Sequence, residues 1–223
     1  MRSYQQFCPA ARALDIVGER WTLLVIRELL RGPKRYTDVQ DGLPGVGPNV
    51  LAARLRSLEQ AGVVEKRRLP PPAASTVYAL TGLGEGLRPV LTSLFDWGLQ
   101  LADAPGKNDA VKASYWLPAI EHAIHPEALP ADVDDTYEIR VGDESIVVTA
   151  AHGTAGVTAG RAESPDLVLT TDHKTFADLG RGALTTSEAF EQRRLTVEGD
   201  PAAAQRWAAL FGGAASAAAG AGN

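Results

Sequence analysis

The chain has 223 residues, of which 45% are apolar and 22% charged, a composition typical of a globular protein with room for two domains. Its net charge of −5 argues against nucleic-acid binding by the chain as a whole, but residues 1–106 carry +3 and residues 107–223 carry −8. A mildly basic half is thus joined to an acidic half, and only the first suits a nucleic acid.

A single cysteine, Cys8, excludes an intramolecular disulfide and suits a reducing compartment. A signal peptide has a basic segment followed by an apolar one, and the N-terminal residues show no such pattern. The longest apolar runs are far shorter than a bilayer span requires. We therefore expect a cytoplasmic protein without a membrane partner.

Two helices are predicted first. Apolar residues recur at helical spacing from Pro9 to Leu30, Gly18 divides the stretch, and Gly32-Pro33 ends the second helix. The predicted buried face of this pair consists of Leu14, Val17, Trp21, Leu24 and Val25.

A helix-turn-helix is predicted next. Thr37-Asp38 can cap a short helix that reaches about Gln40, and residues 41–45 (DGLPG) are a dense turn signal. A second helix, Pro48–Ala61, has proline at its start and Gly62 as its stop. The apolar residues expected on its buried side are Val50, Leu51, Leu55 and Leu58.

A hairpin and a long helix complete this domain. Val63–Leu69 and Thr76–Leu80 are predicted strands, and Thr81 is the predicted cap of a helix from about Gly84 to Ala102. This order of elements is typical of a winged helix-turn-helix. The long helix carries an apolar stripe that either completes the core or pairs with a second copy: Leu87, Val90, Leu91, Leu94, Trp97 and Leu101.

The second helix of a helix-turn-helix reads bases in the major groove, where Asn pairs with adenine and Arg with guanine. Cations on a neighbouring hairpin suit phosphates or the minor groove. The alternative is a solvated basic hairpin on an ordinary helical domain. The predicted DNA contacts are Lys34, Arg35, Thr37, Pro48, Asn49, Ala53, Arg54, Arg56, Lys66, Arg67 and Arg68. Among them, Arg54 is expected to read a base and Lys66 to bind phosphate.

Several segments of the first half resemble the HxlR-type winged-helix regulators, namely Cys8-Pro9 and residues 13–22 (ALDIVGERWT), 26–32 (IRELLRG), 43–51 (LPGVGPNVL), 55–64 (LRSLEQAGVV) and 78–81 (YALT). The resemblance implies a homodimer that binds a palindromic operator and acts on neighbouring genes. Gly47 departs from the family, which commonly has a serine cap there, so we expect a slightly looser helix start. Some members respond to oxidants through a cysteine near the position of Cys8; the alternative is a small apolar residue at a dimer seam.

Residues 104–109 (APGKND) are the predicted linker, so domains at 1–104 and 110–211 are expected, followed by a disordered Ala/Gly tail at 212–223. The second domain is predicted to mix helices and strands. Its expected helices are 113–124, 175–180, 186–192 and 201–211. Its expected strands are 136–141, 144–151, 156–162, 166–171 and 194–198, with Gly142-Asp143 as a hairpin turn.

Residues 164–172 (SPDLVLTTD) and 194–200 (RLTVEGD), with Gly182-Ala183-Leu184 between them, resemble a sterol-carrier-protein-like domain. That resemblance implies an α+β fold with a hydrophobic tunnel and a small apolar or lipid-like ligand. The candidate lining residues are Trp116, Ile120, Phe176, Leu179, Leu184, Phe190, Trp207 and Phe211, although such side chains are also ordinary core residues. The predicted fold class is therefore α+β, a winged helix-turn-helix followed by a sterol-carrier-like domain.

No constellation predicts catalysis, a metal or a cofactor. His122 and His125 lie near Glu121, but no Cys or third His stands at ligand spacing. Residues 82–86 (GLGEG) lack the spacing of a dinucleotide-binding loop. We expect a transcriptional regulator that senses a ligand and is not an enzyme. The alternative is a lipid carrier whose basic domain serves assembly only.

Overall fold

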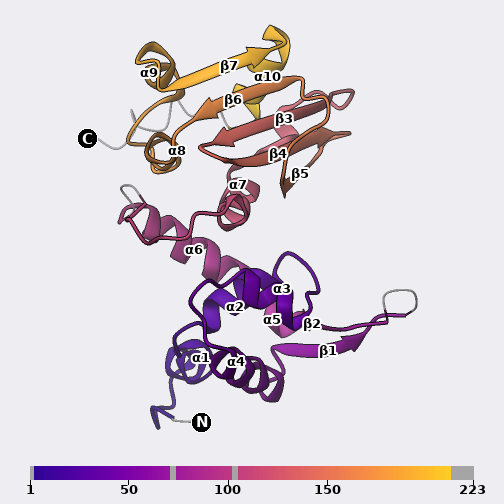
Figure 1. Ribbon diagram of the computed structural model, residues 1–223, viewed down its shortest axis with the longest axis vertical. Coiled ribbons are helices and arrows are strands. Elements are labelled where there is room, and N and C mark those ends of the chain that lie inside the picture. The colour runs from indigo at the N-terminus through magenta and orange to yellow at the C-terminus, as the bar shows by residue number, and fades with distance from the viewer. Residues whose placement is uncertain (1–2, 71–73, 102–104, 212–223) are drawn as a thin grey trace. The chain divides into compact units, whose positions relative to one another are not determined.

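The computed structural model describes residues 3–70, 74–101 and 105–211 (Figure 1). The chain divides into two compact units, Met1–Ser93 and Leu94–Asn223. Helix α6 (Arg88–Leu99) runs through this division, so the predicted domain limits at 104 and 110 stay predictions. The predicted disordered tail, 212–223, lies outside the described residues.

Unit 1 opens with α1 (Pro9–Val17) and α2 (Thr22–Leu29), and Gly18 ends α1 as predicted. Val17 and Val25 are buried, and Trp21 packs against the same core. The prediction was wrong for two leucines of the expected buried face, because Leu14 and Leu24 are exposed. Residues 18–21 are not helical, so the helical phase assumed from Pro9 to Leu30 is not kept between the two helices.

The predicted helix-turn-helix is present as α3 (Tyr36–Asp41) and α4 (Pro48–Gln60). Helix α3 begins earlier than predicted. Arg35 is its N-cap, and the Asp38 carboxylate accepts a hydrogen bond of 3.0 Å from the Arg35 amide, so Asp38 lies inside the first turn. Thr37 therefore also lies in the helix and does not cap it.

Helix α4 buries Leu51, Leu55 and Leu58 as predicted. Val50 was also expected to be buried, but it is exposed, because it is turned by about 100° from its neighbour Leu51, which faces the core. Gly47 precedes the helix with extended backbone and supplies no side-chain hydrogen bond, as its lack of a side chain requires.

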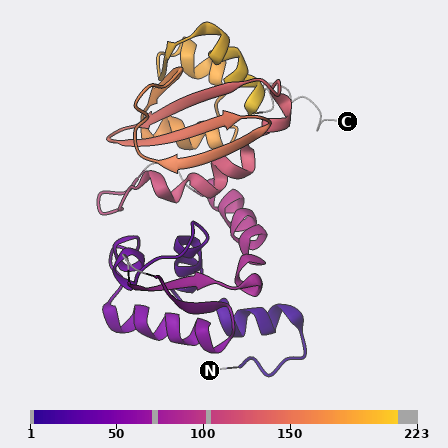
Figure 2. The same cartoon turned by 90° about the vertical axis from the view of Figure 1, so that its right-hand side faces the viewer.

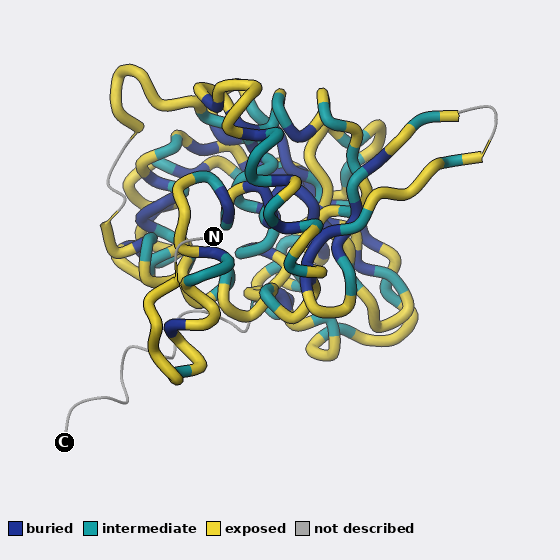
Figure 3. Tube along the Cα trace, turned by 90° about the horizontal axis from the view of Figure 1, so that it is seen from below, coloured by how far each residue is buried: buried dark blue, intermediate teal, exposed yellow. Residues whose placement is uncertain are grey.

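Strands β1 (Val64–Arg68) and β2 (Thr76–Leu80) form the predicted antiparallel hairpin, called the wing below. Figure 1 shows the wing projecting from unit 1, and Figure 3 shows that its outer part is exposed. Lys34 extends the wing at its base. Its amide donates to the Tyr78 carbonyl at 3.0 Å and its carbonyl accepts from the Tyr78 amide at 2.8 Å.

The long helix predicted after the wing is two helices, α5 (Gly82–Glu85) and α6. Thr81 does cap the first of them, since its Oγ1 accepts from the Gly84 amide at 3.3 Å. Pro89 explains the break, because a continuous helix would need an amide at this residue to bond the Glu85 carbonyl. Proline is tolerated in the first turn, so α6 starts at Arg88.

Unit 2 contains a five-stranded sheet in the order β5-β4-β3-β6-β7. Strands β3 and β6 are parallel, and the other neighbouring pairs are antiparallel. The five strands are β3 (Asp134–Val141), β4 (Glu144–Ala151), β5 (Thr154–Ala159), β6 (Leu167–Thr171) and β7 (Leu195–Gly199). Each overlaps a predicted strand. Gly142 has positive φ in the β3–β4 turn, as the hairpin signal required.

The helices of unit 2 gather on one face of this sheet (Figure 2). Along β3 that face carries Tyr137, Ile139 and Val141, which alternate with residues of the opposite face. The helical elements are η1 (Ala113–Tyr115), α7 (Leu117–Ala123), η2 (Pro126–Ala128), α8 (His173–Gly180), α9 (Thr186–Glu191) and α10 (Pro201–Leu210). The single helix predicted at 113–124 is divided because Pro118 must lie in a first turn.

Candidate nucleic-acid interface

The outer side of α4 is the part of unit 1 suited to a DNA groove. Successive helical residues are turned by about 100°, so the side opposite the three buried leucines can be identified. That side carries polar and small residues: Asn49, Ala53, Arg56 and Gln60. Asn49 and Arg56 are exposed, and Ala53 between them adds little bulk. The structure thus brings together three of the predicted contacts and adds Gln60, which the sequence analysis missed.

Arg54 does not belong to this outer side. It lies on the flank of α4, where its Nη1 is 3.6 Å from Glu19 Oε2 and its side chain is only 23% exposed. Its buried Nε has no hydrogen-bond partner among the described residues. Because Arg54 is turned toward Glu19, this placement argues against the prediction that Arg54 reads a base, and it favours Arg56.

The three cations of the wing are divided between its two sides, because consecutive residues of a strand alternate. Lys66 is on the side of α4, where its Nζ is 2.9 Å from Glu59 Oε2 and 5.6 Å from the centre of the Tyr78 ring. Arg68 shares this side of the strand and is exposed. Arg67 lies on the opposite side, where its Nε donates a 2.7 Å hydrogen bond to Glu65 Oε1.

The remaining predicted contacts lie around α3. Lys34 is held by Glu28, with Nζ 2.7 Å from Oε2. Arg35 is exposed, and its Nε donates to Ser75 Oγ at 3.2 Å. Thr37 and Pro48 are exposed at the starts of α3 and α4. The sequence analysis missed Tyr36, whose hydroxyl donates to the Pro48 carbonyl at 2.8 Å and links the two helices; a single tyrosine gave no signal for this role.

Carboxylates lower the net positive charge of this surface. Glu19, Glu28, Glu59 and Glu65 each hold one of the predicted cations. The hydrogen bond to Glu59 raises the pKa of Lys66, so Lys66 stays protonated at neutral pH. Arg56 and Arg68 form no ion pair with any residue that the structure describes, which leaves both guanidinium groups available to an anion.

The ligand candidates of unit 2 lie in or against its core, with one exception. Ile120 and Leu184 are buried, and five partly buried side chains pack against the same core: Trp116, Phe176, Leu179, Trp207 and Phe211. The ring of Trp116 meets those of Phe95 and Phe176 edge-on, at 5.6 and 4.9 Å between centroids. Phe190 is 58% exposed and does not line the interior, because α9 buries the neighbouring Ala189 and turns Phe190 outward.

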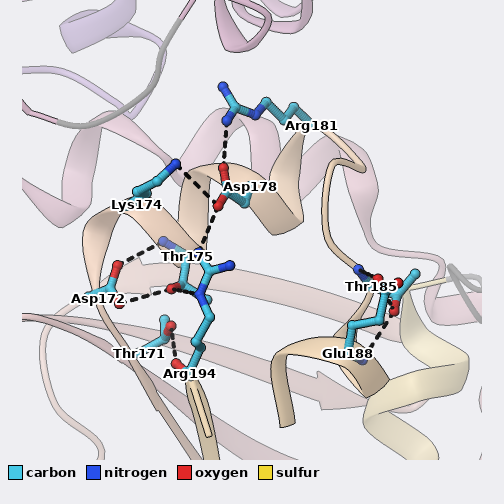
Figure 4. A network of polar contacts seen from close by, with 9 residues as sticks. All are labelled: Thr171, Asp172, Lys174, Thr175, Asp178, Arg181, Thr185, Glu188 and Arg194. Atoms are coloured by element: carbon cyan, nitrogen blue, oxygen red, sulfur yellow. Dashed lines mark hydrogen bonds and ion pairs between the residues drawn. The ribbon is translucent and has the colours of Figure 1, made fainter. Parts of the chain in front are cut away.

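A polar network fastens the start of β7 to α8 (Figure 4). Asp178 is buried, and its Oδ2 is 2.7 Å from Arg194 Nη2 and 3.5 Å from Lys174 Nζ. Arg181 bonds the other carboxylate oxygen, and Arg194 Nε donates to Thr175 Oγ1 at 3.1 Å. The hydrogen bond from Arg194 lowers the pKa of Asp178, so the carboxylate remains ionised and the network holds the fold together.

Within the described ranges, no group of three or more His, Cys, Asp or Glu residues could hold a metal ion. His125 lies with its Nδ1 3.2 Å from Glu127 Oε1. The same ranges contain no helix with the length and apolar character needed to cross a bilayer.

Comparison with known proteins finds a family match in each half of the chain. Residues 16–105 match the HxlR-like helix-turn-helix family. The uncharacterized HTH-type transcriptional regulator YvaP of Bacillus subtilis is 33% identical over 99 residues, which cover 44% of this chain and 92% of YvaP. The chain belongs to the HxlR-like helix-turn-helix family. Residues 121–212 match the SCP-2 sterol transfer family. The predicted fold class, a winged helix-turn-helix followed by an α+β sterol-carrier-like domain, is thus confirmed.

A second HxlR-like relative is the HTH-type transcriptional regulator YodB of Bacillus subtilis, which is 35% identical over 100 residues covering 44% of this chain and 88% of YodB. The solved structure of its reduced form covers 46% of this chain and 100% of that chain at 34% identity, with a TM-score of 0.39. Both relatives match the HxlR-like half.

Helix α6 of the HxlR-like chain presents apolar side chains to solvent. Leu87 and Leu91 pack against the core of unit 1, so this part of the predicted dimer stripe is core. The other members of the stripe are exposed, Trp97 to 59%: Val90, Leu94, Trp97 and Leu101. The core alternative thus holds for Leu87 and Leu91, and pairing of the exposed residues with a second copy stays a prediction.

Cys8, the cysteine of the HxlR-like half, directly precedes α1 as its N-cap residue and is partly buried as a free thiol. No side-chain hydrogen bond caps the helix at this position. A redox role for Cys8 remains a prediction.

Proposed function

We propose that this HxlR-like protein is a transcriptional regulator that binds double-stranded operator DNA through α4 and the wing. The observation that carries the proposal is the shared placement of Asn49 and Arg56 on the outer side of α4 and of Lys66 and Arg68 on the adjoining side of the wing. Asn and Arg offer the donors that discriminate bases in the major groove, and the wing cations suit backbone phosphates. The HTH-type regulators among its relatives support the same DNA-binding function.

The regulator acts as a homodimer in this proposal. An apolar side of α6 is exposed at Val90, Leu94 and Trp97 and continues to Leu101 just after the helix, and a second copy would cover it. A twofold dimer places its recognition helices about 34 Å apart, one turn of the duplex, and therefore suits a palindromic operator.

The SCP-2-like half is the proposed sensor of a small apolar or lipid-like molecule. Its family match and the partly buried aromatic side chains beside its core support this assignment. Its acidic charge suits a domain that stays off the DNA. Binding of the ligand would then alter the affinity of the dimer for its operator.

Fluorescence anisotropy with the full-length protein tests the DNA-binding part. The probe is the duplex immediately upstream of the protein's own coding sequence, and the control is a scrambled duplex of equal length and composition. We expect tighter binding to the upstream duplex at moderate salt. Equal binding to both duplexes would overturn the regulator assignment and favour the lipid-carrier alternative.

Light scattering tests the dimer. The wild-type chain is expected to be dimeric, and the double substitution Leu94→Glu with Trp97→Glu is expected to be monomeric, because it places charges on the apolar side of α6. The control Gln100→Glu adds charge at an exposed residue of the same region that is outside this apolar set. A monomeric wild type, or a dimer that survives the double substitution, would contradict the proposed interface. Native mass spectrometry of the purified protein checks for a bound apolar molecule.

A further inference from the structure

A buried carboxylate lies where α2 meets the base of the wing and the turn that follows α3. Glu28, on α2, is only 2% exposed. Its Oε2 is 2.7 Å from Lys34 Nζ, and its Oε1 accepts hydrogen bonds from Arg27 at 3.2 Å (Nε) and 2.9 Å (Nη2). Burying a carboxylate is costly unless it is paired and hydrogen-bonded, and removing its partner is strongly destabilising.

Three segments meet at this carboxylate. The first is α2 itself. The second is the base of the wing, because the backbone of Lys34 exchanges two hydrogen bonds with Tyr78 of β2. The third is the turn that follows α3, where the backbone of Gly42 lies against the carboxylate so closely that a Cβ at this residue would overlap it. Gly42 has ordinary right-handed helical backbone, so the requirement for glycine here is one of space.

We infer that Glu28 is a positioning residue for DNA binding, which fixes the wing and the α3–α4 turn to α2 through Lys34 and Gly42. This inference rests on the proposed function. Lys34 then acts as an internal brace. Its side chain is 21% exposed and its ammonium group is committed to Glu28, in contrast to the exposed Arg56 and Arg68. In this role Lys34 supports the wing from inside, whereas the sequence pattern placed it among the DNA contacts.

The spacing between wing and recognition helix matters because the two must meet the same duplex. A specific complex demands both sets of contacts at once, whereas loose electrostatic binding does not. Disturbing Glu28 is therefore expected to reduce discrimination between operator and scrambled DNA more than it reduces binding to scrambled DNA.

The salt dependence of binding separates the brace from a phosphate contact. Lys34→Gln is expected to lower affinity for the upstream duplex roughly tenfold, a typical coupling effect between contacting residues, with the slope of log affinity against log salt unchanged. A slope reduced by about 0.9 would show that Lys34 neutralises a phosphate, and the inference would be wrong.

A double-mutant cycle tests the link to Glu28. Glu28→Gln and Lys34→Gln are expected to be non-additive in both thermal unfolding and operator affinity, because each breaks the same pair. Additive effects would contradict the brace. If Glu28→Gln fails to fold, Gly42→Ala supplies the second test, because the added methyl displaces the carboxylate while leaving its charge. We expect Gly42→Ala to lower discrimination, whereas Gly82→Ala, where no atom lies within 4 Å of the new methyl group, should not.

The outcomes distinguish this inference from the proposed function. Non-additive thermal unfolding together with equal wild-type binding to both duplexes would overturn the proposed function while the brace stands. Discrimination by the wild type that Gly42→Ala and Lys34→Gln both leave intact would overturn the positioning role alone.

Discussion

Lys66 on the wing donates a hydrogen bond of 2.9 Å from Nζ to Oε2 of Glu59 on α4. The two side chains are 43% and 36% exposed, so solvent screens their ion pair and the pair is weak. The pair joins the two elements proposed to contact DNA. It also places a carboxylate on the surface that the phosphates would approach, so Glu59 lowers the attraction of this surface for any duplex.

We therefore expect Glu59→Gln to tighten binding to both operator and scrambled DNA several-fold at low salt. The substitution removes one negative charge and releases Lys66 for a phosphate, which adds up to about 0.9 to the salt slope. Anisotropy titrations over a range of salt concentrations measure both quantities.

The matched control is Glu85→Gln in α5, which removes a carboxylate that is paired with Arg88 and belongs to neither α4 nor the wing. Weaker binding by Glu59→Gln would mean that the pair with Lys66 organises the wing. It would contradict the expectation that Glu59 lowers the attraction of this surface for DNA.

Arg56 and Arg54 provide a second test within one helix. Arg56→Ala is expected to cost about 1–3 kcal/mol of discrimination between the upstream and scrambled duplexes, the value of a good base contact. Arg54→Ala is expected to change discrimination less, because Arg54 is turned toward Glu19. Competition binding with both duplexes measures the ratio. A larger loss from Arg54→Ala would restore the sequence-based assignment.

Arg68 and Arg67 provide a third test, on one strand. Arg68→Ala is expected to weaken binding to all duplexes and to reduce the salt slope by about 0.9, as loss of one phosphate contact requires. Arg67→Ala is its control, because Arg67 lies on the opposite side of β1 and bonds Glu65. Equal slopes for both variants would show that DNA does not distinguish the two sides of the wing.

The Asp135–Arg206 pair makes unit 2 sensitive to acid. Hydrogen bonds from Arg206 lower the pKa of Asp135, and Oδ1 of Asp135 is 2.8 Å from Arg206 Nη2. The unfolded chain binds this proton more readily, so the stabilisation is present above the ordinary aspartate pKa of about 3.9 and is lost as pH falls through the lower folded value.

Asp135→Asn is expected to reduce stability at pH 7 by about 1–3 kcal/mol, the range for a hydrogen-bonded charged group. The difference from wild type should shrink as pH falls below about 4, since protonation of Asp135 weakens the same contacts. Thermal melts of both proteins at pH 7 and below about pH 4 measure this difference in stability. The control is Asp134→Asn, at an exposed residue of the same strand. A constant difference across this pH range would contradict the role of the ionised pair.

The order of elements in both units was predictable because local signals coincide with it. Pro48 and Gly62 bracket α4, and Gly142 marks the β3–β4 turn. The pattern did not reveal that β5 begins at Thr154, because the turn before it places His152 as well as Gly153 at positive φ, a conformation that is uncommon for residues other than glycine.

The sequence was less informative about the directions of side chains in the candidate site. Arg54 and Arg56 are the same residue type on the same helix. They differ only in direction around α4 and in the contact of Arg54 with the Glu19 carboxylate. Glu28 could not be recognised as a buried residue, because its partners come from a wing segment and a turn that meet only in the folded chain.

Gly47, the N-cap residue of α4, leaves the first amide groups of this helix without a side-chain acceptor. Other helices of this protein take their caps from their own chain, as Thr185 does for α9 and Asp200 for α10. Helix α4 has neither a side-chain cap nor an acidic residue in its first turn, so the positive end of its dipole, about half an elementary charge, is left to the surroundings. A phosphate oxygen would supply the missing acceptor. In free solution water must take that place, so an anion that binds at this end of α4 would cap the helix from outside the chain.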